Sequence, residues 1–180
     1  MSPPTTSSKY SEAKTGVFWD VTDCPIPTGL DPGSIHQNIE LALAKKGYHG
    51  EVTITPYCDK NQFPDGPDDF ESAGMKLIPT GDKHMRLRKM VQEFTRWVLN
   101  EGLSNFMVIS RNGMELARAL QSLKRNGHNI FFAHPQHGPI QTRSYDLATE
   151  LWVWETLAAG GDPIVKTKRD AEVSNKEDDV

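Results

Sequence analysis

The chain has 180 residues and a formal net charge of -4, which suits one domain with a hydrophobic core and is short for two. Its apolar fraction of 37% and charged fraction of 24% are ordinary for a globular protein and exclude wholesale disorder. Because the net charge is negative, contact with a nucleic acid requires a local basic patch. No apolar run approaches the roughly 20 residues of a membrane-spanning helix, so no membrane partner is expected.

Both ends of the chain are polar. Residues 1–15 and 161–180 carry no periodic apolar pattern and are predicted to be disordered, which leaves residues 16–160 as the folded domain. The Ser/Thr/Pro-rich start has no apolar stretch behind it and does not resemble a secretory signal. The two cysteines, Cys24 and Cys58, are expected to be free thiols of an intracellular protein, cytoplasmic or nuclear.

The first part of the chain predicts three short strands and one helix. Residues 16–19 are a compact hydrophobic run that stops at an aspartate. Residues 31–47 begin with Asp-Pro, a pair typical of a helix start, continue with apolar residues at helical spacing and end at a glycine. Residues 52–55 and 76–78 are the second and third apolar runs, and each predicts a strand.

The second part of the chain continues the same alternation. Residues 83–100 form the longest predicted helix, and its apolar side chains share one face. The continuous apolar run at 105–109 indicates a strand buried on both faces, and an asparagine able to cap a helix opens residues 112–127. A fifth strand at 129–133 and a last helix at 145–158 follow. Strands alternating with helices predict a three-layer α/β fold with a mainly parallel sheet of about five strands.

Acidic residues follow the first two predicted strands. In an open parallel sheet, functional residues gather at the carboxyl ends of the strands, where Asp20, Asp23 and Asp59 stand. These carboxylates could bind Mg²⁺ weakly, since that ion accepts one or two carboxylates plus water. A firmly held nuclease metal uses acids from more strands, yet Arg111 and Asn112 follow the fourth strand. The alternative, in which the three aspartates only cap hydrated turns, stays open.

The start of the longest predicted helix is basic. Cations are unfavourable near a helix N-terminus unless an anion is present, and guanidinium groups suit phosphate. The candidate RNA-binding residues are Lys83, Arg86, Arg88, Lys89 and Arg111. The alternative is a solvated basic face in which Lys89 pairs with Glu93. On the last predicted helix, Trp152 and Trp154 are about 200° apart, so one is expected inside and the other on a partner-facing surface.

The segment Gly16-Val-Phe-Trp-Asp-Val-Thr-Asp-Cys-Pro-Ile-Pro27 resembles the opening of plant NYN-domain endonuclease-like proteins and of the meiosis regulator and mRNA stability factor family. The resemblance covers about residues 16–160 and continues in Ile54–Asp59, Ile78–Gly81, Met107–Ser110 and Asn129–Pro135. It implies a PIN-like, Rossmann-like fold and, in active members, RNA cleavage that depends on Mg²⁺ or Mn²⁺. It suggests the peroxisome by family association alone, since the chain ends in Asp-Asp-Val, which is not a peroxisomal signal.

Carried onto this sequence, the resemblance keeps the first catalytic acid as Asp20 and loses most of the others. The family's remaining acid positions are occupied by Thr22, His84, Leu87, Asn112 and Met114. Two unit charges about 4 Å apart interact by roughly 4 kcal/mol at an effective dielectric near 20. Replacing metal-binding acids by neutral residues, and adding Arg111, should therefore lower the affinity for a divalent cation by orders of magnitude.

The sequence accordingly predicts a catalytically degenerate NYN domain that binds RNA and acts in the regulation of gene expression. Two alternatives remain open. One is a weak Mg²⁺- or Mn²⁺-dependent ribonuclease that uses Asp20, Asp23 and Asp59. The other is a protein-interaction module that forms a homo-oligomer or joins another NYN protein. Whether the chain is an enzyme is left undecided at this stage.

Overall fold

The protein is described by a computed structural model that covers residues 8–138 and 146–165. Its sheet has six strands in the order β3-β2-β1-β4-β5-β6, and every neighbouring pair is parallel. The strands are β1 (Thr15–Asp20), β2 (Val52–Asp59), β3 (Ile78–Thr80), β4 (Asn105–Ile109), β5 (Asn129–His134) and β6 (Glu150–Val153). The helices are α1 (Pro32–Lys45), α2 (Pro67–Ser72), α3 (Lys83–Glu101), α4 (Gly113–Arg125) and α6 (Trp154–Ala158).

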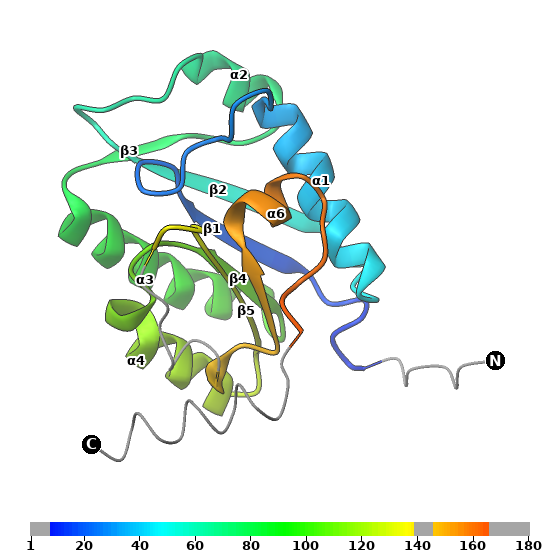
Figure 1. Ribbon diagram of the computed structural model, residues 1–180. Coiled ribbons are helices and arrows are strands. Elements are labelled where there is room, and N and C mark those ends of the chain that lie inside the picture. The colour runs from blue at the N-terminus through cyan, green and yellow to red at the C-terminus, as the bar shows by residue number, and fades with distance from the viewer. Residues whose placement is uncertain (1–7, 139–145, 166–180) are drawn as a thin grey trace.

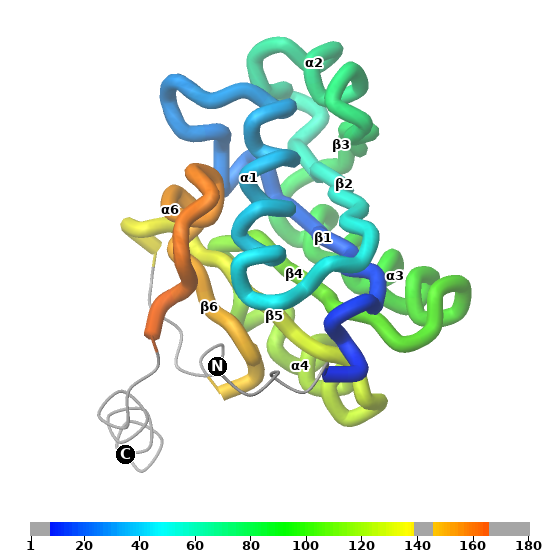
Figure 2. The backbone as a smooth tube through the Cα atoms, turned by 90° about the vertical axis from the view of Figure 1, so that its right-hand side faces the viewer, coloured from blue at the N-terminus to red at the C-terminus, as the bar shows by residue number. Residues whose placement is uncertain are grey.

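The helices cover both faces of the sheet, which confirms the predicted three-layer α/β architecture. Figures 1 and 2 show α1 and α6 side by side on one face, while α3 and α4 lie on the other. One hydrophobic core joins α1, α2 and α6 to the sheet, with Trp19 and Phe131 among its strand residues. A second core joins α3 and α4 to the opposite face, where Phe18 and Phe106 are buried.

Local sequence signals explain why the two main helices begin where they do. The carboxylate of Asp31 accepts the backbone N–H of Ser34 at 2.8 Å, and Pro32 occupies the first turn of α1, as predicted. Asp82 caps α3 in the same way by accepting the backbone N–H of Met85 at 3.0 Å. Both helices then bury an apolar stripe against the sheet, which fixes their direction across it.

The helix predicted at residues 145–158 is interrupted by a strand, and residue 145 itself lies outside the described residues. Glu150–Val153 is instead a sixth strand that extends the sheet beside β5, whereas residues 146–147 and Trp154–Ala158 are helical as predicted. Trp152 and Trp154 are both buried, so neither indole forms a partner-facing surface. This strand forms because it pairs with the edge of β5, and the spacing of apolar residues within a short segment gives no information about such a pairing partner. The third strand also lies slightly later than predicted, at Ile78–Thr80.

The folded domain extends beyond residues 16–160 at both ends. The Tyr10 hydroxyl donates to the carbonyl of Gly127 at 2.5 Å, and the Asn105 amide donates to the carbonyl of Tyr10 at 3.0 Å. Predicted disorder is therefore wrong for residues 8–15, whereas residues 1–7 lie outside the described part. At the other end, the backbone N–H of Ile164 donates to Leu151 at 2.7 Å, and residues 166–180 are not described.

Within residues 8–138 and 146–165, none of the helices combines the length and the apolar character that crossing a bilayer requires.

Candidate functional site

The candidate site lies at the carboxyl ends of the central strands. The sheet order reverses between β1 and β4, because β2 and β3 lie beyond β1 while β5 and β6 lie beyond β4. Open α/β sheets bind ligands at such a reversal. The side chains gathered there, which we call the mouth, are Asp20, Asp23, Asp59, Arg86 and Asn112. The structure thus brings together the three aspartates that the sequence proposed as metal ligands.

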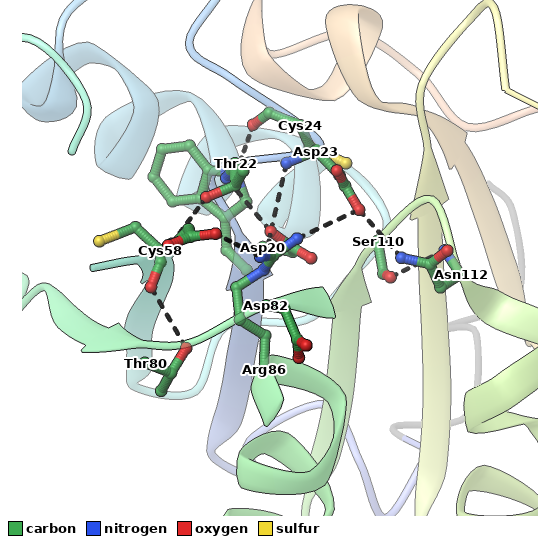
Figure 3. A network of polar contacts seen from close by, with 12 residues as sticks. Asp20, Thr22, Asp23, Cys24, Cys58, Thr80, Asp82, Arg86, Ser110 and Asn112 are labelled. Carbon is green, nitrogen blue, oxygen red and sulfur yellow. Dashed lines mark hydrogen bonds and ion pairs between the residues drawn. The ribbon is translucent and has the colours of Figure 1, made fainter. Parts of the chain in front are cut away.

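A buried arginine lies among these carboxylates. Arg86 reaches from the first turns of α3 toward Asp20, and only 3% of its surface is exposed (Figure 3). Its Nε lies 3.1 Å from Asp20 Oδ1, and its Nη2 lies 3.5 Å from Asp23 Oδ2. Its Nη1 lies 3.9 Å from Asp59 Oδ2 and donates to the carbonyl of Gly81 at 3.3 Å. Each nitrogen of the guanidinium group therefore faces a different carboxylate.

Asp20, the last residue of β1, is fully buried. Its Oδ1 accepts the backbone N–H groups of Thr22 at 3.1 Å and Asp23 at 3.2 Å, in addition to Arg86. Its Oδ2 is also buried and has no hydrogen-bond partner. Burial raises the pKa of Asp20 above its ordinary value, although Arg86 acts in the opposite direction. Oδ1 of Asp20 thus accepts three hydrogen bonds, whereas Oδ2 accepts none.

Asn112 occupies a position where the resemblance places an acid. It stands at the N-cap of α4, but its side chain makes no capping hydrogen bond, so the predicted capping role is wrong. Its Nδ2 instead donates to Asp23 Oδ2 at 3.0 Å, and its backbone N–H donates to Ser110 Oγ at 2.9 Å. Asn112 therefore supplies the mouth with a donor that faces a carboxylate.

Two buried indoles and one hydroxyl hold the loop after β1 in place. The Trp19 indole N–H donates to the carbonyl of Cys24, and the Trp154 indole N–H donates to the carbonyl of Pro25, both at 2.8 Å. Thr22, at a position where the resemblance places an acid, accepts the backbone N–H of Asp59 at 2.9 Å through its hydroxyl. These contacts connect three separate segments, so the sequence alone gives no sign of them.

The predicted basic patch is divided by the fold. Arg86 is buried within the mouth, so its predicted place on an exposed phosphate-binding face is wrong. Lys83 Nζ lies 2.9 Å from Glu115 Oε1 on α4, and this contact lowers the pKa of the Glu115 carboxyl.

The expected pair of Lys89 with Glu93 is confirmed at 3.2 Å. Arg88 and Arg111 are exposed, and they remain the most accessible guanidinium groups of the predicted set.

The other positions where the resemblance places acids add no metal ligands to the mouth. Leu87 is buried in the core beneath α3, whereas His84 and Met114 are exposed. Cys24 and Cys58 are free and buried, and burial raises the pKa of both thiols, so neither is activated as a thiolate ligand.

The residues of the mouth do not fit the Mg²⁺ or Mn²⁺ ion that the resemblance implies. A divalent ion needs carboxylate oxygens that converge on one point, and here those oxygens face a guanidinium group and amide donors. Across the described residues, no group of three or more His, Cys, Asp or Glu side chains is arranged to hold a metal ion. The predicted ligands Asp20, Asp23 and Asp59 do meet, but they meet around Arg86.

Comparisons with known proteins agree with this architecture. The sequence matches the NYN domain family over residues 14–147. A protein of unknown function from Vibrio parahaemolyticus has a similar solved structure, with a TM-score of 0.55 and 11% sequence identity over 80% of this chain and 94% of that one. At this identity the likeness concerns the fold alone. No curated protein matches the chain in sequence.

Proposed function

The chain belongs to the NYN domain family, a group of PIN-like nuclease-related domains, and from that premise we propose that it binds RNA without hydrolysing it. One observation carries this proposal: the cation among the strand-end carboxylates is the protein's own Arg86. Metal-dependent hydrolysis needs a divalent ion that activates water at this place. A guanidinium group fixed by three carboxylates neither generates hydroxide nor leaves room for the ion.

Binding of RNA is supported by two arginines that are exposed. Arg88 and Arg111 are exposed, on α3 and directly after β4 respectively. Guanidinium groups bind phosphate in a bidentate manner, and such contacts need no metal. Lys83 and Lys89 are less exposed than these two arginines, so we assign them a secondary role. A domain of this kind would regulate transcripts by occupying them.

A cleavage assay on single-stranded RNA tests the first half of the proposal. We expect the purified chain to leave RNA intact in the presence of Mn²⁺ or Mg²⁺, with no more product than the Asp20→Asn variant gives. The Asn side chain keeps the shape of the carboxylate and removes its charge, so it is a suitable negative control. Cleavage by the natural chain that disappears in Asp20→Asn would refute the proposal and identify a ribonuclease.

A filter-binding assay tests the second half. Reversing the two exposed charges, with Arg88→Glu and Arg111→Glu together, should weaken RNA retention by about tenfold or more, since each lost phosphate contact is replaced by repulsion. Arg125→Glu is the matched control, because Arg125 is exposed on the last turn of α4, at the opposite end of that helix. Equal retention by the double variant and the control would show that RNA does not bind through these two arginines.

A further inference from the structure

We infer that Arg86 is a resident counter-ion that takes the place of a divalent cation, so that the mouth is built around a side chain and needs no metal. The inference rests on the proposed function, because it explains why an NYN domain without metal-dependent hydrolysis keeps a cluster of carboxylates. It concerns the stability of the folded chain, whereas the proposed function concerns RNA.

The geometry of the guanidinium group supports this role. Arg86 is buried, and its three nitrogens are directed toward Asp20, Asp23 and Asp59 at 3.1, 3.5 and 3.9 Å. These partners come from β1, from the loop after β1 and from β2, so one side chain of α3 joins three segments of the chain. A surface arginine would contact at most one or two acids and would stay hydrated.

The unpartnered oxygen of Asp20 is a second, independent observation. Oδ2 is buried without a hydrogen-bond partner, and Asp20 as a whole has no exposed surface. A buried carboxylate of this kind is strongly unfavourable unless a cation lies close to it. Removing the charge of Arg86 would leave Asp20 facing Asp23 and Asp59 without the guanidinium group that now lies close to all three carboxylates.

Substitutions at residue 86 separate a counter-ion from a packing residue. Arg86→Met keeps much of the length and removes the charge, and we expect it to lower the thermal midpoint by about 10 °C, as for a broken buried ion pair in a chain of this size. Arg86→Lys keeps the charge on a single ammonium group and should lose less. Arg118→Met is the matched control, since it makes the same change at an exposed arginine of α4.

Two further measurements test the role of charge directly. Adding Asp20→Asn to Arg86→Met should restore at least half of the lost midpoint, because the uncompensated charge is then gone. Adding 1 mM Mn²⁺ (about a thousandfold excess over micromolar protein) should raise the midpoint of Arg86→Met by about 3 °C or more, and should leave the natural chain and the double variant unchanged.

The inference fails if Asp20→Asn gives no recovery in the Arg86→Met background, or if Mn²⁺ does not stabilise Arg86→Met, or if Mn²⁺ stabilises the natural chain. Should Arg86→Met not fold, the double variant decides: the inference requires it to fold, and an unfolded double variant overturns it. All midpoints are measured on the full chain without RNA. A negative result in these stability measurements therefore does not affect the conclusions from the cleavage and filter-binding assays. A negative result in those assays likewise does not affect the conclusion about Arg86.

Discussion

Arg86 shows what a sequence can and cannot reveal about a single residue. Its position among basic neighbours suggested an exposed phosphate-binding face, yet it is one of the most buried charged residues described. One signal does point to its burial: Arg86, Met90 and Phe94 follow each other at intervals of four, which places the arginine on the apolar stripe of α3. The carboxylates that compensate it come from β1 and β2, and no local pattern could identify them.

His128 provides a prediction at the same scale. Its side chain is buried, and its Nδ1 accepts the backbone N–H of Ser104 at 3.3 Å, which requires the neutral ring. Burial lowers the pKa of His128 below 6.5, so the unfolded chain takes up a proton first as the pH falls. The stability that His128 contributes is therefore complete above about pH 6.5 and decreases below it.

Urea unfolding at pH 7.5 and at pH 5.5 measures this effect. The natural chain should lose more stability between the two values than His128→Gln, whose amide does not titrate. Every other titrating group is shared, so the difference isolates His128. Parallel losses in the two proteins would contradict the expected role.

At the scale of elements, local sequence patterns predict a helix or strand correctly where the apolar residues of the pattern are also the buried ones. The buried strand at 105–109 follows directly from its apolar run, and the start of the helix near residue 32 follows from its Asp-Pro pair. The sequence failed at β6, because a four-residue strand depends on the neighbouring edge of β5. It failed at Asn112 for a related reason, since the Asn112 side chain makes its hydrogen bond to Asp23 of a distant segment and none to the first turn of α4.

The cap of α3 offers a test at this scale. Asp82 accepts the backbone N–H of Met85, and the helix it begins carries Arg86 into the mouth. Asp82→Ala should destabilise the chain by about 1 kcal/mol, the usual cost of losing an N-cap acceptor. Asp82→Asn should cost much less, because asparagine caps equally well. Equal losses in urea unfolding would mean that the charge of Asp82, and not its capping bond, matters.

For the whole molecule, the negative net charge restricts how RNA can bind. With a net charge of -4, the chain repels a polyanion except where guanidinium groups face outward. Binding to single strands through two phosphate contacts predicts a slope of about -1.4 for the logarithm of the affinity against the logarithm of salt concentration. Arg88→Glu with Arg111→Glu should flatten that slope, while Arg125→Glu should leave it unchanged. A steep slope that persists in the double variant would place the binding face elsewhere.

The anchored segment before β1 has a practical consequence for such measurements. Tyr10 is held by Gly127, which precedes β5, and by Asn105, the first residue of β4. Both contacts lie at the amino ends of these strands, whereas the mouth lies at the carboxyl ends of the same parallel sheet. A linker joined to the chain ahead of Ser8 would therefore leave from the far side of the molecule. Coupled to a sensor chip through that linker, the protein would present its arginines to the flowing solution, and immobilisation would not shield them.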